Sequence, residues 1–350
     1  HAAEDADSLP SAAAIQKREG AYWTWQMEEL AALPEARDAA IFAAAYGMKA
    51  TGNARPASDP HGVLAGQNTL FRALPDPELA TMFDCTEAQI RTHLQATSQR
   101  LLGIRARRPP PHRDDKIVTA WNGLAIAALA RGARVLARPD LAEAATAAAV
   151  FLRRELWDGS NLWRSFRGRR GTVHGFPADY TCLIAGLIEL HAISPTEDWL
   201  EWAQLLQQRL DTLFWDDDRI GYVMRPALGP NTLLVIREDY DGAEPSPNHL
   251  AAENLIKLAA LLDDDAHRSR ADALLQAGSK MLETHPFAAP LLVAALDLHQ
   301  RGVMKFQIPP CAPTALLQNL HASFLPRAVH TQSSGTSITL CEGVTCRNYP

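Results

Sequence analysis

Apolar residues recur every three or four positions through most of the chain from residue 118 onward, which is the spacing of one face of an α-helix. Proline, aspartate or threonine stands at most boundaries between these runs, where helices commonly begin. Strand-like alternation is scarce. The pattern predicts seven helices, at residues 118–137, 140–156, 178–193, 196–214, 248–262, 265–283 and 287–302.

The predicted helices alternate in character. The first of each pair is rich in small apolar residues, as in 118–137, and the second is longer-chained and more charged, as in 196–214. A helix that is apolar on all sides needs burial, whereas an amphipathic helix suits an outer layer. The phrases Trp157-Asp158 and Trp215-Asp216 close the first two pairs. Such repetition predicts an array of helical hairpins.

Paired inner and outer helices close into an α/α toroid, and an open superhelix is the alternative. We expect an all-α fold with an incomplete six-hairpin toroid over residues 1–302. After each Trp-Asp phrase the chain turns polar, aromatic and glycine-containing, which predicts short β-hairpins or loops at one rim of the ring. Residues 303–350 predict a small α+β segment with strands at VMKFQI and SITLC around a helix near 314–323.

The N-terminal part carries weaker signals. Residues 20–30 read as a strand-like aromatic stretch that runs into a helix, and residues 52–68 read as a loop. A basic cluster surrounds three consecutive prolines, and we interpret it as a solvated, stiff connector. Its members are Arg105, Arg107, Arg108 and Arg113.

Composition excludes some classes of protein. The chain has 350 residues, 47% of them hydrophobic, and a net charge of −6, so it does not resemble a nucleic-acid binder, which normally presents a basic face. No apolar run reaches the roughly 18 residues that a membrane span needs. We therefore expect neither nucleic acid nor membrane as a partner.

Five cysteines without a CxxC pair predict a reducing compartment, cytoplasmic or organellar, rather than a disulfide framework. Cys341 and Cys346 could pair or bind a metal, but we expect free thiols. The chain begins at His1, so its sequence leaves any targeting signal undetermined.

Four motifs occur in a fixed order that resembles the spermatogenesis-associated protein 20 family, including its bacterial YyaL relatives. The resemblance covers about residues 4–350. The motifs are GAYWTWQMEEL (20–30), DDKIVTAWNGLAIAALARGARVL (114–136), ADYTCLIAGLIELH (178–191) and EDYDGAEPSPN (238–248).

Members of that family look like a thioredoxin-like domain followed by a six-hairpin, glycosidase-like α/α toroid. The resemblance implies that this chain is a C-terminal toroid portion, without the thioredoxin-like domain and its cysteine pair. It also implies a ring that does not close on its own residues, and a thioredoxin-like domain as a candidate partner in the full-length protein. The family supplies no established catalytic residue to carry over.

The stretch REDYDGAEPSPN places Glu238, Asp239, Asp241 and Glu244 just before a predicted helix. Acidic side chains are favoured at a helix N-terminus by the free backbone N–H groups and the helix dipole. That account does not require four of them. Crowded carboxylates also raise one another's pKa, which suits a general acid. Capping and participation in a site both remain open.

Two other predicted inner helices begin in the same manner. Their starts would converge at one end of a toroid, and convergent polar groups in an apolar concavity predict a binding site. Tryptophan offers a flat face to a sugar ring and asparagine bonds to hydroxyls, although either could instead pack between helices or cap one. The catalytic candidates are Asp115, Asp179, Asp241 and Glu244, and the substrate-binding candidates are Trp121, Asn122, Tyr180, Asn248 and His249.

Sugar epimerisation would need two bases, often histidines, whereas glycoside hydrolysis would need two carboxylates. Among the nearby histidines, His249 follows a helix start, His174 lies in a predicted rim loop and His191 reads as structural. No metal-binding spacing and no phosphate loop is present, so we predict neither a metal nor another cofactor.

These observations favour a toroid that binds a small sugar and performs acid/base chemistry on it, of the hydrolase or epimerase type. The alternative is a non-catalytic scaffold that mediates protein interactions for a redox partner domain. An enzyme should show carboxylates with shifted pKa values at the helix starts. A scaffold should show the same carboxylates acting as caps.

Overall fold

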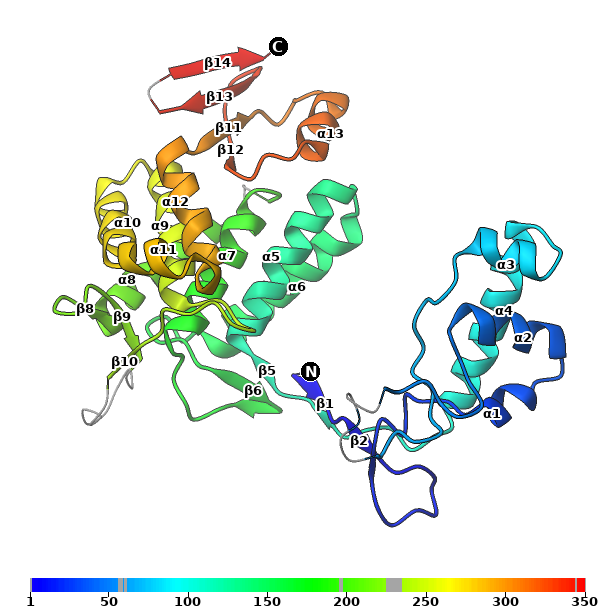
Figure 1. Ribbon diagram of the computed structural model, residues 1–350. Coiled ribbons are helices and arrows are strands. Elements are labelled where there is room, and N and C mark those ends of the chain that lie inside the picture. Colours follow the sequence, from blue (N-terminus) through cyan, green and yellow to red (C-terminus); the bar gives the residue numbers. More distant parts are fainter. Residues whose placement is uncertain are drawn as a thin grey trace. The chain divides into compact units, whose positions relative to one another are not determined.

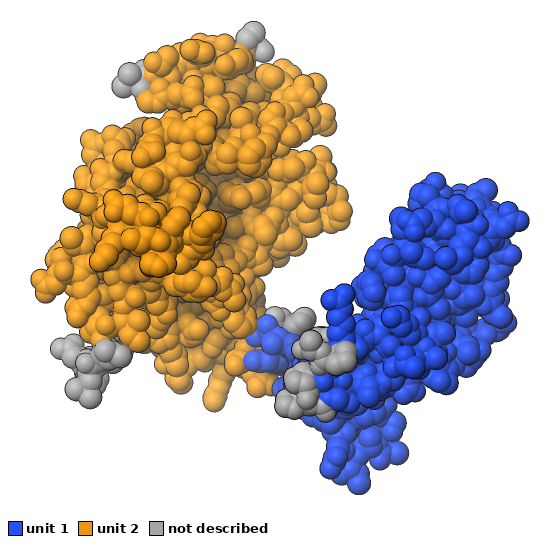
Figure 2. Space-filling model, viewed as in Figure 1, with its two compact units in different colours: residues 1–115 blue, residues 116–350 orange. Residues whose placement is uncertain are grey.

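The computed structural model describes residues 2–55, 59, 62–194, 198–224, 235–343 and 345–349. The chain divides into two compact units, residues 1–115 and 116–350 (Figure 2). The second unit contains the predicted helical hairpins. The predicted helix at 196–214 has its first two residues outside the described part, and so do parts of the predicted loop at 52–68.

Four helices form an inner layer in which α5 packs against α7, α7 against α9, and α9 against α12 (Figure 1). Their small and branched apolar side chains face one large core. Thirteen of the residues of α7 are buried, including both ends of the helix, which is the burial predicted for an inner helix. These helices span Thr119–Leu136 (α5), Pro177–His191 (α7), Pro247–Leu262 (α9) and Pro290–Arg301 (α12).

An outer helix follows each of the first three inner helices and packs on it. The predicted helix 265–283 is two helices, because the chain breaks at Gly278, where an added Cβ would lie 2.4 Å from the Leu292 side chain. The hairpin pairing confirms the predicted fold, an incomplete α/α toroid. The outer helices span Pro139–Leu156 (α6), Trp199–Phe214 (α8), Asp265–Ala277 (α10) and Ser279–Thr284 (α11).

Helices α5 and α7 approach each other so closely that two positions exclude any side chain. A Cβ on Gly123 would lie 2.5 Å from the backbone of Cys182 and Leu183, and one on Gly186 would lie 2.7 Å from the carbonyl oxygen of Gly123. Small residues therefore set the spacing between α5 and α7.

The rim predicted after each Trp-Asp phrase consists of two small antiparallel sheets. The strand order is β5-β6-β7 in one and β10-β9-β8 in the other. Asp158 accepts bonds from the backbone N–H groups of Ser160 and Asn161, and Asp216 accepts one from that of Arg219, so each Asp closes a turn. The strands are Ile117–Val118 (β5), Ser165–Arg167 (β6), Arg169–Arg170 (β7), Trp215–Asp216 (β8), Gly221–Met224 (β9) and Ile236–Arg237 (β10).

The C-terminal segment has the predicted α+β character, but its sheet has four strands where the sequence predicted two. Strand β11 pairs parallel with β12 and antiparallel with β13, which pairs with β14. Helix α13 supplies the crossover between β11 and β12, because parallel neighbours need a long connection. The elements are Met304–Ile308 (β11), Thr314–Ala322 (α13), Ala328–Gln332 (β12), Ile338–Glu342 (β13) and Thr345–Tyr349 (β14).

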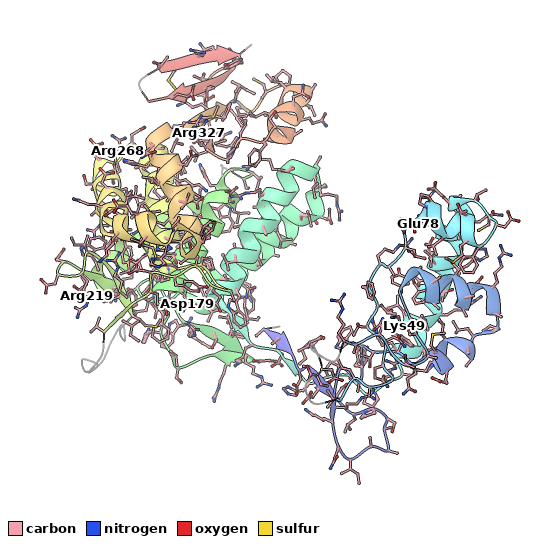
Figure 3. The ribbon with its side chains drawn as sticks, viewed as in Figure 1. Lys49, Glu78, Asp179, Arg219, Arg268 and Arg327 are labelled. Carbon is pink, nitrogen blue, oxygen red and sulfur yellow. A yellow bond between two sulfur atoms is a disulfide. The ribbon has the colours of Figure 1, made fainter. Side chains whose placement is uncertain are left out.

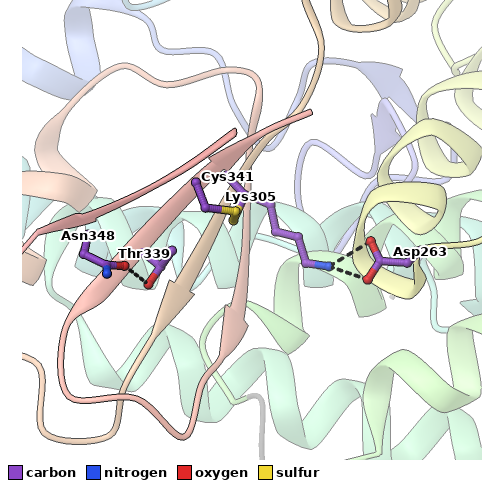
Figure 4. Close-up of a disulfide and its surroundings, with 6 residues drawn as sticks. Asp263, Lys305, Thr339, Cys341 and Asn348 are labelled. Carbon is purple, nitrogen blue, oxygen red and sulfur yellow. Dashed lines mark hydrogen bonds and ion pairs between the residues drawn. A yellow bond between two sulfur atoms is a disulfide. The ribbon is translucent and has the colours of Figure 1, made fainter. Parts of the chain in front are cut away.

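The prediction of free thiols at Cys341 and Cys346 is wrong, because the two form a disulfide (Figure 4). They face each other across the β13–β14 hairpin, with Cα atoms 4.1 Å apart. Directly opposed residues of neighbouring antiparallel strands lie at bridging distance, and sequence spacing alone does not reveal that register. The disulfide also removes the ground for expecting a reducing compartment.

The first unit has its own core around Trp25, Ile41, Phe42 and Ile90. The predicted helix after the aromatic stretch is α1, whereas α2, α3 and α4 were not predicted. The aromatic stretch itself is mostly turn, with one isolated β-bridge at Trp25, so the strand prediction is wrong there. The helices span Met27–Ala31 (α1), Ala36–Ala45 (α2), Asp76–Met82 (α3) and Glu87–Arg105 (α4), and the strands Ala3–Glu4 (β1), Asp7–Ser8 (β2), Arg18–Glu19 (β3) and Arg113–Asp114 (β4).

The basic cluster is only partly a solvated connector. The guanidinium of Arg108 lies 4.1 Å from the centre of the Trp25 ring, donates to the carbonyl oxygens of Tyr22 and Thr24, and pairs with Glu29 at 2.8 Å. Arg108 therefore fixes the aromatic stretch to the end of α4. The predicted boundary between residues 302 and 303 falls between α12 and β11 and stays a prediction.

Candidate functional site

The N-terminal ends of α5, α7 and α9 meet at one end of the second unit. The backbone N–H of Ala120 donates to Asp179 over 3.0 Å, and the indole N–H of Trp121 donates to Glu244 over 2.9 Å. Ala120, Cys182 and Leu250, one from each helix, pack together. The predicted convergence of the helix starts is thus confirmed.

Asp179 is completely buried in the first turn of α7 (Figure 3). Its carboxylate accepts bonds from the backbone N–H groups of Ala120 and Phe176 and pairs with Arg164 at 3.2 Å. Burial raises the pKa of Asp179 to about 6, against the opposing effect of these three partners. The contacts make Asp179 a helix cap that also joins α7 to the start of α5.

Tyr180 lies beside Asp179 and is also buried, with 1% of its surface exposed. Its hydroxyl oxygen accepts a bond from the backbone N–H of Leu162, and its ring packs edge-on against Phe214. Burial raises the pKa of this hydroxyl. Tyr180 therefore belongs to the core that supports the rim.

Asp241 stands before α9 and connects two helix starts. Its carboxylate accepts bonds from the backbone N–H groups of Ser246 and Leu291, at 2.9 Å each, and so satisfies a donor at the start of α12. The imidazole Nδ1 of His249 lies 3.1 Å from the same carboxylate, and both side chains are buried. Asp241 therefore caps two helix starts, and the buried His249 ring packs beside it without a well-aligned hydrogen bond.

Asn248 holds the same loop from below. Its side-chain oxygen accepts a bond from the backbone N–H of Tyr222 at 2.7 Å, and its amide donates to the carbonyl oxygens of Tyr222 and Glu238. With 2% of its surface exposed, Asn248 positions β9 and the backbone of Glu238.

Asn122 and Asp115 take no part in the contacts described above. The amide of Asn122 donates to the carbonyl oxygen of Val118 within the first turn of its own helix, at 2.8 Å. Asp115 is the last residue of the first unit, whereas the other candidates belong to the second.

Trp121 and Glu244 are the two candidates that combine exposure with mutual contact. Trp121 exposes 39% of its surface, and Glu244, which accepts its indole N–H, is also exposed. An exposed aromatic face next to a carboxylate can contact the apolar face and the hydroxyl groups of one small polar molecule.

Glu238 completes this site, although the sequence did not single it out among the four acids. Its carboxyl is half-buried, and burial together with the negative charge of Glu244 raises its pKa, while Arg164 opposes the shift. Glu238 and Glu244 line an open pocket of about 560 Å³ with Asp239, Tyr240 and Ala178. The sequence pattern marks this stretch as rich in acids, but the path of the loop decides which of them is buried.

Two searches of the described residues bear on other chemistry. No group of three or more His, Cys, Asp or Glu side chains is arranged to hold a metal ion in the part of the chain that the structure describes. Within the same residues, no helix is long and apolar enough to cross a bilayer.

The fold and the site define an α/α toroid protein with a carboxylate-lined pocket where its inner helices begin. The chain is 34% identical over 96% of its length to spermatogenesis-associated protein 20 of Homo sapiens and 33% identical over 96% to that of Mus musculus. It belongs to the spermatogenesis-associated protein 20 family. It spans about half the length of these relatives, 46% and 45%. No family model matches the chain.

Solved structures give more distant likenesses. A cellobiose 2-epimerase from Bacillus thermoamylovorans matches with 16% identity and a TM-score of 0.40, covering 47% of this chain and 45% of its own. A GH76 α-mannanase from Bacteroides thetaiotaomicron matches with 12% identity and a TM-score of 0.44, covering 61% and 59%.

Proposed function

We propose that this chain binds a small saccharide in the pocket beside Trp121 and performs acid/base chemistry on it with Glu238 and Glu244. One observation carries the proposal. Glu238 is a half-buried carboxyl whose pKa is raised by burial and by Glu244, in a pocket next to an exposed indole. Two carboxyl groups with different environments are the usual means of dividing acid and base roles.

The two carboxyl groups have distinct roles in this proposal. Glu238 keeps its proton to higher pH than an ordinary glutamic acid and serves as the general acid toward a leaving oxygen. Glu244 is more exposed and serves as the carboxylate partner, as base or nucleophile. Trp121 is not itself a lining residue of the pocket, but its indole is bonded to Glu244, which is, and in this proposal its exposed face supports the sugar ring at the pocket's edge.

The histidines favour hydrolysis over epimerisation. His249 is buried against Asp241, and the His174 ring stacks on that of Trp163 with centres 4.1 Å apart. Neither lies among the residues that line the pocket. We therefore infer carboxylate-based chemistry of the glycoside-hydrolase type.

The proposed site is narrower than the sequence-based set. It retains Trp121 and Glu244 and adds Glu238. Five buried candidates position the loop and the helix starts instead of contacting a ligand, and Asp115 and Asn122 receive no role. The five positioning residues are Asp179, Tyr180, Asp241, Asn248 and His249.

A specific observation also favours the scaffold hypothesis. Asp179 and Asp241 both cap helices, which is what that hypothesis predicts for the acids at the helix starts. A non-catalytic toroid that serves a thioredoxin-like partner domain is therefore retained as the second candidate function.

Calorimetry with a panel of mono- and disaccharides distinguishes the two proposals. We expect saturable binding that weakens roughly tenfold in Trp121→Ala, because the indole face is removed. Glu238→Gln should retain binding and lose turnover by roughly 10²–10⁴, the usual contribution of a general acid. Glu143→Gln, an exposed acid on α6, is the matched control and should behave as wild type.

The pH dependence is a second readout. Activity should fall as pH rises through the raised pKa of Glu238, because the general acid then loses its proton. If no saccharide binds at millimolar concentration, the enzyme proposal is wrong and the scaffold becomes the better account.

A further inference from the structure

A second pocket lies at the opposite end of the inner helices, where α5, α7 and α9 end below the C-terminal segment (Figure 1). Its volume is about 360 Å³, within the range of small-molecule sites. Figure 3 shows Asp179 near one end of the unit and Arg327, which lines this pocket, at the other. The pocket is therefore separate from the proposed saccharide site.

Charged side chains from three inner helices gather at this pocket. Glu189 of α7 accepts a bond from Arg131 of α5, and lies 3.4 Å from Arg134 and 3.7 Å from Lys257 of α9. Lys257 also pairs with Glu253 at 2.6 Å. Burial raises the pKa of Glu189, but Lys257 and the two arginines outweigh that effect and lower the pKa to about 2. Glu189 is therefore ionised.

This cluster carries one positive charge in excess. Three cations, Arg131, Arg134 and Lys257, share two carboxylates, Glu189 and Glu253. The remaining charged side chains of the lining have opposite partners elsewhere: Asp297 pairs with Arg301 at 3.6 Å and Arg327 with Glu342 at 3.9 Å.

Arg134 is the least neutralised of the three cations. Its side chain is 12% exposed, and its carboxylate partner lies at the long distance of 3.4 Å. Its other contact is Nδ1 of His330, at 3.1 Å, which must accept because a guanidinium has only donors. Burial, Arg134 and His321 lower the pKa of His330 to about 3, so this ring stays neutral and supplies no counter-charge.

An unused polar group lies in the same pocket. The Nε2 of His321 on α13 is buried and has no hydrogen-bond partner among the described residues. Buried polar groups are nearly always paired with protein or water, so this ring nitrogen is available to a ligand that enters the pocket.

We propose that this pocket binds a small anion through a phosphate or carboxylate group, which Arg134 and Arg131 contact and His321 helps to fix. Guanidinium groups bind such planar or tetrahedral anions with paired, charge-assisted bonds. The pocket joins the inner helices to the C-terminal segment, so a bound anion links α5 and α13. This inference does not depend on the proposed saccharide site.

Thermal unfolding and calorimetry of the whole chain test the proposal with four probes: inorganic phosphate, glucose 6-phosphate, glucuronate and glucose. We expect at least one anion to raise the Tm and bind saturably, and glucose to leave this pocket empty. The phosphate and glucuronate arms distinguish the two anionic groups. Binding should weaken roughly tenfold or more in Arg131→Gln, because a charge-assisted bond is lost.

Arg131→Gln is the preferred variant because Arg131 is 57% exposed, so the change spares the buried core. Arg154→Gln, which removes a 66%-exposed arginine from the outer helix α6, is the matched control and should bind as wild type. His321→Ala is a second test and should weaken anion binding without changing the response at the saccharide site.

The proposal is wrong if none of the three anions binds, or if Arg131→Gln and Arg154→Gln weaken their binding equally. It is also wrong if glucose competes for the same pocket as effectively as the anions. Failure of the saccharide site, tested with Trp121→Ala, would leave these outcomes unaffected.

Discussion

The substitution Gly123→Ala tests the close contact between α5 and α7. The added methyl carbon would lie 2.5 Å from the carbonyl group of Cys182 and from the nitrogen of Leu183, whereas ordinary contacts begin at 3.4 Å. These neighbours are backbone atoms, so no side-chain rotation can relieve the clash. Helix α7 must move by about 1 Å, and that movement would stretch the 3.0 Å bond from Ala120 to Asp179.

The magnitude follows from three contributions. Overpacking typically costs about 1–3 kcal/mol. Loss of a bond to a buried carboxylate costs about 1–3 kcal/mol. The better helix propensity of alanine stabilises the folded state by about 1 kcal/mol. We therefore expect Gly123→Ala to lower the free energy of unfolding by about 1–5 kcal/mol.

Urea unfolding followed by circular dichroism measures this change, with Gly132→Ala as the control in the same helix. At Gly132 the nearest atom to an added Cβ is the flexible end of Leu141, at 3.3 Å, so that variant should be neutral or stabilised. If Gly123→Ala unfolds at the same urea concentration as wild type, the close approach of α5 and α7 does not exist as described. Equal losses in both variants would show that the effect is not specific to this contact.

Two further predictions concern the buried candidates. Because the pKa of Asp179 is raised from 3.8 to about 6, the folded chain holds a proton that the unfolded chain has released, so stability is present at low pH and falls as pH rises through this range. The free energy of unfolding should fall by about 3 kcal/mol over this pH range. Urea unfolding at several pH values measures it, and Asp179→Asn should flatten this part of the stability–pH curve. Asn248→Ala should lower the free energy of unfolding by about 2–4 kcal/mol, since it leaves the backbone groups of Tyr222 without partners, and a wild-type urea midpoint would contradict this.

The helical hairpins could be predicted because their signal is local and periodic. The inner helices begin and end within three residues of their predicted bounds, since apolar spacing and boundary prolines act within one helix. The single helix predicted over 265–283 fails at Gly278, where packing against Leu292 breaks it. Helices α2 to α4 mix apolar and polar residues around their faces, so their apolar spacing does not stand out in the sequence.

Long-range features could not be predicted. The disulfide between Cys341 and Cys346 depends on the register of β13 and β14, which no local pattern specifies. The charge cluster around Glu189 combines residues from α5, α7 and α9 that lie far apart in the sequence. In the sequence, each member is an ordinary charged residue near the end of a helix. The excess positive charge arises only when the three helices pack together.

The acids at the helix starts show where sequence reasoning reaches its limit. Asp179, Asp241 and Glu244 share one local pattern, an acid near the beginning of an inner helix, and that pattern is equally consistent with capping and chemistry. Burial separates them: the first two satisfy buried backbone donors, whereas Glu244 is exposed beside Trp121. A carboxylate already committed to several backbone N–H groups cannot leave them for a substrate without exposing the helix ends. In the proposed function the acid/base roles therefore fall to acids that no backbone donor occupies. Of the three acids that line the pocket, Asp239 lies 3.1 Å from Arg237, which leaves Glu238 and Glu244 for those roles.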